Sequence, residues 1–402
     1  MSVLILTPQI PWPPHQGASL RNFNIIKGLS VELDVSLLSF AESDQSTDVA
    51  PLAILLKRFE TVAVPKRSML RRLVQLASSR FPDMGHRLYS PDFFSKLEQM
   101  LKELKPDIVQ IEGIELARAI PIIQQASPHS KIVFDNHNAE TALQERIYET
   151  DIRQLRKLPK AIYSRIQVSK LGHFEQWACQ ESDIVTAVSE RDAQILNHFR
   201  KPEQSPVTAI PNCIDTSNFQ PVDGEGEKLY DLVFTGKMDY RPNIDAMLWF
   251  TQGIWPLIKQ VKKSAKLVIV GKNPGPTISA LDKIDGITVT GAVAEIAPWL
   301  NCSRVMVMPL RMGSGTRLKL IQALAAGLPV VSTSNGAEGY PVQAGEELLL
   351  GDSEDDFAQQ TLKLLDSTQL QQKLGTNGRS FAEAYDWRKV IPRFIELYSQ
   401  ES

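Results

Sequence analysis

Cysteine is scarce in this 402-residue chain, which contains only Cys179, Cys213 and Cys302. No two of them show the C-x-x-C spacing of a thiolate metal site or a redox pair. So few cysteines argue against a disulfide framework and are typical of a reducing compartment, so we expect a cytoplasmic protein. Long apolar runs are also missing, because no window approaches the roughly 20 apolar residues of a membrane-spanning helix. The short apolar run 2–7 lacks a basic lead, which argues against a signal peptide.

An excess of charge of one sign is the third absence. The net charge is −2, with 43% hydrophobic and 22% charged residues, so we expect neither an overall nucleic-acid binder nor a disordered chain. Solenoid repeats and low-complexity tracts are not found. At 402 residues the chain exceeds what one hydrophobic core usually supports, which predicts two domains of roughly 200 residues each.

Short apolar runs alternate with longer segments of helical period. This pattern predicts an α/β protein whose parallel strands are covered by helices on both faces. In the first half the expected strands are 3–7, 35–40, 107–112, 131–136, 183–189 and 207–211. In the second half they are 232–237, 267–271, 287–291, 305–309, 329–333 and 347–351.

The two series of strands are separated by a turn-rich stretch that contains Pro221, Gly224 and Gly226. We therefore expect an N-terminal domain over 1–212, a linker over 213–229 and a C-terminal domain over 230–386. Residues 387–402 are expected to form a helix that packs back toward the N-terminal domain. Doubly wound sheets bind ligands beyond the carboxyl ends of their strands, so two such domains predict a ligand cleft between them.

A glycine loop in the second half is the most informative segment. Gly313, Ser314 and Gly315 follow an apolar strand and precede a helix that carries Arg317 and Lys319. The glycines permit a tight turn whose backbone no side chain covers. The backbone amides of the following helix face the loop, where a phosphate can accept hydrogen bonds from them. Taken alone, an ordinary turn of an α/β domain explains the loop equally well.

Gly236 and Lys237 occupy the first strand-to-helix turn of the second half. A surface lysine is the plain alternative for Lys237, but Arg317 and Lys319 would be close by on a neighbouring loop. Three cations near one glycine loop favour a phosphate site. Gly17 holds the corresponding turn of the first half, where a ligand role or a merely tight turn is possible and no G-x-G-x-x-G fingerprint occurs.

Polar groups also gather after the apolar strand 131–136, where Asp135, Asn136, His137, Asn138 and Glu140 follow one another closely. Buried polar groups need partners, and a cleft supplies a polyhydroxy ligand or water. Helix capping by Asn138 and a structural histidine are the alternative. The concentration of such groups favours a functional site.

Taken together, these segments resemble the retaining glycosyltransferases of family 4, also described as glycosyl transferases group 1. The resemblance spans nearly the whole chain. It implies the GT-B fold, in which two Rossmann-like, doubly wound domains face each other across a central cleft. It is carried by the Gly17 loop, 135–138, 185–190, 210–212, 234–237, 289–293 and above all 315–331.

The resemblance assigns roles to individual residues. His137, Lys237 and Arg317 are the implied catalytic residues, with His137 near the donor sugar and the two cations on the diphosphate of a nucleotide-sugar. Like the family, this chain has no D-x-D motif, so neither a metal nor a cofactor besides the nucleotide-sugar co-substrate is expected. The implied donor-binding residues are Gly17, Gly236, Val293 beside the nucleobase, Gly313, Ser314, Gly315, Thr316, Lys319 and Gln322.

Two positions depart from the family pattern. Ser314 and Gln322 stand where the family commonly carries glutamates, one at the head of the loop and one eight residues later. Gln322 can still bond a ribose hydroxyl, but charge-assisted bonds are roughly twice as strong as neutral ones. Ser314 cannot support developing positive charge as a carboxylate does. Slow catalysis, catalysis by other groups and no catalysis all stay open.

The segment 57–105 is strongly basic, with eleven Lys or Arg against five Asp or Glu. Within it, Lys66–Arg80 combines apolar residues at helical spacing with interleaved arginines, as in a helix that rests on an anionic membrane. A helix packed on the core with a solvated basic side is the alternative. The apolar residues concerned are Met69, Leu70, Leu73, Val74 and Ala77.

The leading hypothesis is therefore a cytoplasmic, metal-independent glycosyltransferase for a glycan or lipid-linked acceptor, in peripheral contact with the inner membrane face. A sugar-nucleotide epimerase of the same fold would work without an acceptor. A catalytically weak partner protein would bind the nucleotide-sugar and never turn over. The nucleotide, sugar, acceptor, linkage and oligomeric state do not follow from single residues.

Overall fold

The computed structural model describes residues 1–14, 17–42, 49–152, 158–221, 228–313 and 316–400. The chain divides into two compact units. Unit 1 comprises Met1–Asn212 together with Val390–Ser402, and unit 2 comprises Cys213–Lys389. Part of the expected linker, 222–227, lies outside the described residues.

Unit 1 is built on a parallel sheet. Over its described residues the strand order is β3-β2-β1-β4-β5-β6-β7. The central strands are mostly apolar because helices cover both of their faces, and their side chains are almost fully buried. The strands are β1 Ser2–Thr7, β2 Asp34–Ala41, β3 Arg58–Ala63, β4 Ile108–Glu112, β5 Lys131–Asn136, β6 Ile184–Ala187 and β7 Thr208–Ala209.

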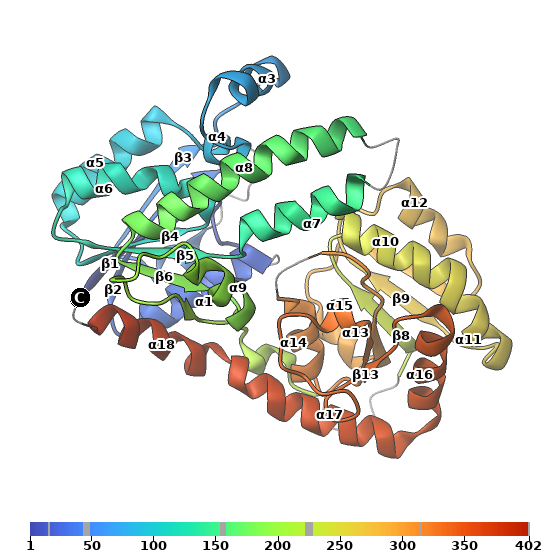
Figure 1. Ribbon diagram of the computed structural model, residues 1–402. Helices are drawn as coiled ribbons and strands as arrows, with labels where there is room; N and C mark the ends of the chain where they lie inside the picture. The colour runs from blue at the N-terminus through green and yellow to red at the C-terminus, as the bar shows by residue number, and fades with distance from the viewer. Residues whose placement is uncertain (15–16, 43–48, 153–157, 222–227, 314–315, 401–402) are drawn as a thin grey trace. The chain divides into compact units, whose positions relative to one another are not determined.

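Helices flank this sheet on both faces (Figure 1). Ile391, in the last helix of the chain, belongs to unit 1 and packs on Gly28, where a Cβ would lie 2.6 Å from Ile391 Cγ1. The helices are α1 Gly17–Leu29, α2 Ala50–Ala53, α3 Met69–Ser78, α4 Asp83–Arg87, α5 Pro91–Leu104, η1 Ile114–Ala119, α6 Ile120–Ala126, α7 Glu140–Ile152, α8 Leu158–Glu181, α9 Glu190–Asn197 and α18 Trp387–Ser399.

Unit 2 repeats this architecture with the strand order β10-β9-β8-β11-β12-β13. Its strands are β8 Tyr230–Thr235, β9 Leu267–Val270, β10 Ile287–Gly291, β11 Ser303–Met308, β12 Val330–Ser332 and β13 Leu349–Leu350. Its helices are η3 Thr216–Phe219, α10 Arg241–Trp249, η4 Phe250–Ile254, α11 Trp255–Val261, α12 Pro276–Ser279, η5 Ala280–Lys283, α13 Ala297–Asn301, α14 Leu318–Ala325, α15 Ser334–Ala337, α16 Glu354–Asp366, α17 Thr368–Ala382 and η6 Glu383–Tyr385.

Both sheets reverse their winding direction once. In unit 1 the chain winds outward from β1 to β3 and then resumes at β4, beside β1; in unit 2 the same reversal lies between β8 and β11. Loops on either side of such a reversal diverge, and the carboxyl ends of the strands there form the usual ligand crevice of doubly wound folds. The two reversals therefore mark where functional residues are expected in each unit.

The α/β class and the doubly wound sheets are confirmed, and one strand was missed. β3 pairs with β2 in register from Ser36↔Arg58 to Ala41↔Ala63. It lies at the sheet edge and is only partly buried, so its sequence Arg-Phe-Glu-Thr-Val-Ala lacks the continuous apolar run of the central strands. No helix in the described part of the chain has the length and apolarity that crossing a membrane requires.

Candidate functional site

The first group of candidate residues lies at the carboxyl ends of β4 and β5 in unit 1. These strands pair in parallel, with Glu112 opposite Asp135 as the last pair. Both carboxylates are fully buried. His137 follows β5 by one residue, and its Nε2 lies 2.7 Å from Glu112 Oε2. Strand register alone thus brings two acids and one imidazole together.

Arg21 compensates the charge of Asp135. Its Nε and Nη2 donate to the two carboxylate oxygens at 3.0 Å each, and both side chains are almost completely buried. Thr186 Oγ1 donates to Asp135 Oδ1 at 2.7 Å. Burial acts to raise the pKa of Asp135, but the Arg21 charge and these hydrogen bonds hold it below its ordinary value. The pair is a structural ion pair with its charge internally balanced.

A chain of buried hydrogen bonds leads to Glu112, the partner of His137. Tyr398 Oη, on α18, donates to Gln110 Oε1, and Gln110 Nε2 donates to Glu112 Oε1. Burial and the Asp135 charge raise the pKa of Glu112. Burial acts to lower the pKa of His137, but its hydrogen bond to Glu112 and the nearby carboxylate charges raise the pKa above its ordinary value. The imidazole is therefore held in one orientation by a buried carboxylate.

Two further carboxyl groups lie at the start of α7, Glu140 of that helix and Glu175 of α8. Glu175 Oε1 accepts from Asn136 Nδ2 at 2.7 Å and from the Glu140 amide at 2.8 Å, and its Oε2 accepts from the Thr141 amide at 3.0 Å. Glu175 thereby satisfies the first amides of the helix. Burial raises the pKa of Glu140 to about 7, with the charges of neighbouring glutamates acting in the same direction. Asn138 donates to Glu140 Oε1 at 2.9 Å rather than capping the helix.

Glu112, Asp135 and His137 place possible metal-ligand atoms within 4.8 Å of one another. The Arg21 guanidinium, however, already occupies both oxygens of Asp135. His137 Nε2 is engaged with Glu112. A cation would have to displace these bonds and approach a buried positive charge, so the arrangement favours a hydrogen-bonded network over a metal site.

The second group lies at the winding reversal of unit 2. After β8, Gly236 leaves space that a side chain would fill, because a Cβ there would lie 2.7 Å from Asn243 Nδ2 and 2.8 Å from Lys319 Nζ. Lys319 Nζ donates to Asn243 Oδ1 at 2.8 Å, and Asn243 Nδ2 donates to the Lys237 carbonyl at 2.8 Å. Asn243 therefore ties the Gly236–Lys237 turn to the first turn of α14.

Lys319 is the most perturbed cation of this group. Its Nζ lies 4.3 Å from the centroid of the Phe234 ring. Burial, and then the charge of Arg317, lower the pKa of Lys319 to about 7. An amine held in this way gains most from an anion, which would restore its full positive charge. Lys237 is different, since its side chain is 43% exposed and its Nζ lies 3.6 Å from Asp239 Oδ1.

The glycine loop itself is described only in part. Ser314 and Gly315 lie outside the described residues. Gly313 has φ +118°, a conformation that favours glycine, and a Cβ there would lie 3.0 Å from Arg317 Nη2. Arg317 therefore folds back over Gly313 just before α14 begins at Leu318. Its Coulombic effect on Lys319 shows that the two cations share one region.

The remaining predicted donor-binding residues occupy four separate segments. Thr316 packs against Gly339, where a Cβ would lie 3.0 Å from Thr316 Cγ2. Gln322 is partly buried in α14, and Val293 is partly buried in the turn after β10. Gly17 is the exposed first residue of α1 in unit 1.

The structure thus brings Gly236, Lys237 and Lys319 together through Asn243, and it joins Arg317 to Gly313. Sequence reasoning missed Asn243, which reads as an ordinary residue of a helix that starts with Arg-Pro-Asn. In unit 1 it missed Arg21, Gln110 and Glu112. The signal for Glu112 was its position as the last residue of a predicted strand, parallel to the strand that ends beside His137.

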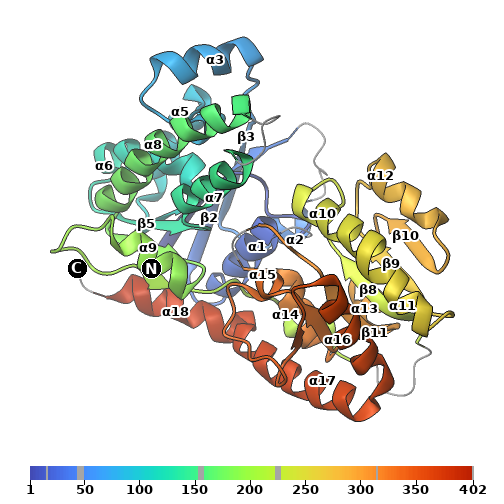
Figure 2. The same cartoon turned by 45° about the vertical axis from the view of Figure 1, so that its right-hand side comes forward.

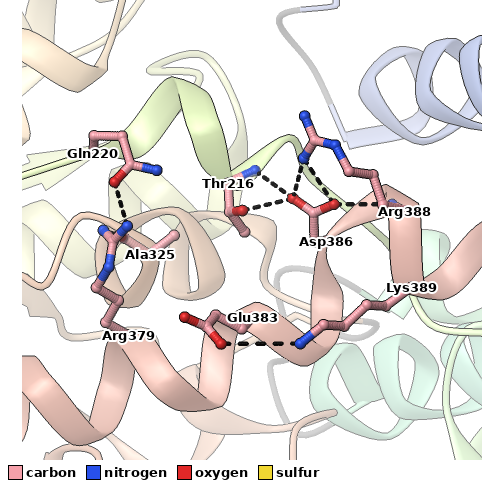
Figure 3. Close-up of a pocket in the computed structure, with 8 residues that line it drawn as sticks. All are labelled: Thr216, Gln220, Ala325, Arg379, Glu383, Asp386, Arg388 and Lys389. Carbon is pink, nitrogen blue, oxygen red and sulfur yellow. Dashed lines mark hydrogen bonds and ion pairs between the residues drawn. The ribbon is translucent and has the colours of Figure 1, made fainter.

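A pocket of about 280 Å³ occupies another part of unit 2 (Figure 3). Its charged groups pair with one another: Arg388 and Thr216 bond to Asp386, and Lys389 Nζ lies 3.9 Å from Glu383. Arg379 donates to Gln220. None of the predicted site residues lines this pocket, and its polar groups are used in joining η3, η6 and α18.

Each half of the chain matches the model of a known protein family. The model described as Glycosyltransferase Family 4 matches residues 23–218, and the model described as Glycosyl transferases group 1 matches residues 230–367. Together they include the winding reversal of unit 2, strand β4 at the reversal of unit 1, and most of the candidate residues. Gly17 precedes the first match.

Two curated relatives match part of the chain. An uncharacterized 44.6 kDa protein in the cps region of Klebsiella pneumoniae is 25% identical over 170 residues, which cover 40% of this chain and 44% of that protein. The MMP alpha-(1->4)-mannosyltransferase of Mycolicibacterium hassiacum is 26% identical over 235 residues, covering 56% and 55%. The chain thus spans about half the length of these relatives.

A solved structure extends the likeness to the whole fold. Anabaena HepE, crystallised with UDP and glucose, superposes with a TM-score of 0.67 at 15% identity, covering 100% of both chains. At this identity the likeness shows the fold alone, which is the GT-B fold. With two family models matched in succession and this fold, the chain belongs to the family 4, or group 1, glycosyltransferases.

Proposed function

We propose that this protein is a retaining glycosyltransferase that moves a sugar from a nucleotide-diphosphate sugar to a glycan or lipid-linked glycan. The observation that carries the proposal is the grouping of Lys319, Asn243 and the bare turn at Gly236. It lies at the winding reversal of a doubly wound sheet, the usual crevice for nucleotides. The crystallised HepE complex with UDP and glucose is consistent with a donor of this class.

In this proposal the diphosphate is the leaving group. Lys237, Arg317 and Lys319 supply positive charge, and the backbone amides at the start of α14 supply dipoles, as negative charge develops on the departing phosphate. The sugar becomes oxocarbenium-like, and the β-phosphate accepts the acceptor proton on the same face, which yields retention. Following the family, His137 contacts the donor sugar, and neither metal nor separate cofactor takes part.

Donor binding is the first test. A panel of nucleotide-sugars and nucleotides is screened by thermal shift, where a ligand at 100 times its dissociation constant stabilises the native state by about 2.7 kcal/mol. Lys237→Ala and Arg317→Ala should abolish that shift or reduce it strongly. Transfer should fall by about 10²-fold to 10³-fold, the usual loss for a group that stabilises the leaving charge. Unchanged transfer in both variants would remove the assignment.

A catalytically weak donor-binding protein is the second candidate. It is favoured by Gln322, which stands on α14 where the family commonly has a glutamate. The variant Gln322→Glu should tighten donor binding through a charge-assisted bond to a ribose hydroxyl. Product analysis with acceptor present decides between the candidates: a transferred sugar with retained configuration supports the enzyme, and donor binding without turnover supports the binding protein. An epimerised donor formed without acceptor would identify an epimerase.

We further propose that the protein works in the cytoplasm in peripheral contact with the inner membrane face. α3 stands away from the rest of unit 1 in both views (Figure 1, Figure 2). Met69, Leu70 and Val74 on this helix are 68%, 73% and 56% exposed, and Arg71 and Arg72 are exposed beside them. Exposed apolar residues next to cations match the surface of an anionic bilayer.

This contact is tested by sedimentation with anionic vesicles at low and high salt. The variant Leu70→Ser/Val74→Ser should reduce binding at low salt, and Val31→Ser/Val261→Ser, which alters equally exposed residues elsewhere, should not. Absence of binding by the unaltered protein at low salt would exclude the contact without touching the donor chemistry.

A further inference from the structure

Two arginines near the C-terminal end of α3 surround one aromatic ring. The guanidinium carbon of Arg118 lies 4.4 Å from the centroid of Phe81 and 3.8 Å from that of Tyr89. Arg80 lies over the same Phe81 ring at 5.2 Å. Stacking on aromatic faces fixes the planes of the guanidinium groups and leaves their N–H edges available. Residues distant in sequence, from the α3–α4 turn and from η1, thus assemble one cationic cluster.

The positive charge of this cluster is not balanced locally. Within the described ranges, neither Arg80 nor Arg118 lies within ion-pair distance of a carboxylate. Asp83, the nearest acid of α4, is already paired with Arg67 at 2.6 Å and contacted by Arg72 at 3.4 Å. Arg118 is partly buried, and burial together with the Arg80 charge lowers its pKa.

Neighbouring groups add to the same field. Lys170 Nζ, from α8, donates to the carbonyls of Leu76 and Ser79 at 2.5 Å and 2.7 Å rather than to a carboxylate. His86 Nε2 lies 2.7 Å from Ser79 Oγ, and burial and then the charge of Arg118 lower its pKa. The positive charges of this cluster repel one another, which is why they lower the pKa of neighbouring groups. Binding of an anion would relieve this repulsion and is therefore favourable.

We propose that Arg80 and Arg118, stacked on Phe81, form a binding site for the phosphate group of a lipid headgroup. Planar guanidinium groups bind phosphate oxygens in pairs, and a phosphomonoester headgroup offers a larger charge and one more oxygen than a carboxylate. The lipid is indicated by the position of the cluster, because Arg80 follows the end of α3 by two residues and that helix carries exposed apolar residues. In this respect the inference rests on the proposed membrane contact.

The role of the site follows from its geometry. A phosphate held by two fixed guanidinium groups defines a depth and an orientation for α3, which apolar residues alone do not. The phosphate could belong to a bilayer lipid or to a soluble phosphate ester, and both share the chemistry recognised by the cluster. The assay therefore has to distinguish recognition of phosphate from general attraction to negative charge. It also has to distinguish binding of a lipid from binding of a soluble phosphate ester.

The experiment compares full-length protein on two kinds of vesicle with equal surface charge. One carries phosphatidic acid, and the other carries a lipid with a carboxylate headgroup, such as cholesteryl hemisuccinate. The test variant is Arg80→Gln/Arg118→Gln. The matched control, Lys66→Gln/Arg71→Gln, removes two exposed cations from the same basic segment without touching Phe81. Arg118→Lys keeps the charge but loses the planar stack, and thermal unfolding verifies that each variant is folded.

The unaltered protein should bind the phosphate vesicles several times more tightly than the carboxylate vesicles. Arg80→Gln/Arg118→Gln should lose about tenfold or more on phosphate vesicles, since each cation at the surface is worth a severalfold change, and should lose the preference. The control should keep the preference, and Arg118→Lys should weaken it.

Equal loss in the test and control variants, or no preference for phosphate in the unaltered protein, would overturn the site. Direct binding of glycerol phosphate at constant ionic strength, together with no binding to phosphate vesicles, would overturn a lipid ligand in favour of a soluble ester. Donor binding and transfer are measured separately, so failure of this site is distinguishable from failure of the proposed activity.

Discussion

The sheets of units 1 and 2 share the order of six strands and place their candidate residues at the same topological position. They differ in the partners of their buried charged groups. In unit 1, Asp135 is paired with Arg21, and Glu112 with His137. In unit 2, Lys319 and Arg317 lie beside glycines, and burial, then the charge of Arg317, lowers the pKa of Lys319. Paired buried charges stabilise a fixed scaffold, whereas a buried lysine with a lowered pKa gains free energy when an anion binds.

The largest expected effect tests the balanced side of this comparison. Arg21→Met leaves Asp135 buried without its partner, so the free energy of unfolding should fall by about 3–5 kcal/mol in urea titrations. The double variant Arg21→Met/Asp135→Asn removes both charges and should recover a substantial part of this loss. A loss below about 1 kcal/mol for the single variant would mean that the pair contributes little and that unit 1 is not built on compensated charge.

The next effect tests the close backbone packing of unit 2. A Cβ at Gly271 would lie 1.7 Å from the Gly236 carbonyl oxygen, so Gly271→Ala must displace the turn that carries Lys237. We expect a cost of about 1–3 kcal/mol in unfolding free energy and a loss of donor affinity. Gly275→Ala is the matched control, because nothing lies within 4 Å of its Cβ position. Equal behaviour of the two variants would contradict the steric argument.

A smaller effect concerns the support of His137. Tyr398→Phe removes the hydrogen bond to Gln110 and should cost about 1 kcal/mol. The pKa of His137, followed by NMR of the imidazole, should move down toward its ordinary value as the Glu112 contact loosens. The pKa of His137 is raised in the folded state. Protonated His137 therefore stabilises the fold fully at pH values below its pKa in the unfolded chain, and this stabilisation is lost as the pH rises through its pKa in the folded chain.

Tyr240→Phe serves as the control for that measurement, since Tyr240 is 53% exposed and lies in unit 2. The same pKa of His137 in both variants would show that the hydrogen-bond chain does not reach the imidazole.

The smallest effect is a proton uptake. Lys319 has a pKa of about 7, so it is mostly neutral at pH 8, and a bound diphosphate should raise that pKa. Calorimetry in buffers of different ionisation enthalpy should show uptake of a fraction of a proton, up to about one, at pH 8 and little at pH 6. Lys319→Met should abolish the uptake and Lys237→Met should not. Uptake that persists in Lys319→Met would assign it to another group.

The same pKa carries a stability prediction with a definite sign. The unfolded chain binds the Lys319 proton more tightly than the folded chain between about pH 7 and pH 10.5, so stability should rise with pH across that window. Lys319→Met should flatten that rise.

Most central strands could be predicted because continuous apolar runs are enough to identify strands that are buried on both faces. β3 was missed because this edge strand has only six residues and mixes polar and apolar ones without a continuous apolar run. The glycine loop and its cations could be predicted because residue type and spacing carry the signal. Asn243 could not, since its importance arises from two hydrogen bonds to segments six residues before it and far after it.

The sequence by itself determined the α/β class, the series of parallel strands and the cationic glycine loop, because local periodicity and glycine spacing express them directly. Only the tertiary structure decided that Arg21 balances Asp135, that Tyr398 supports Glu112 through Gln110, and that Arg80 and Arg118 share Phe81. Most of these contacts join residues separated by tens to hundreds of positions. Their energies depend on distance and burial, which no local pattern encodes.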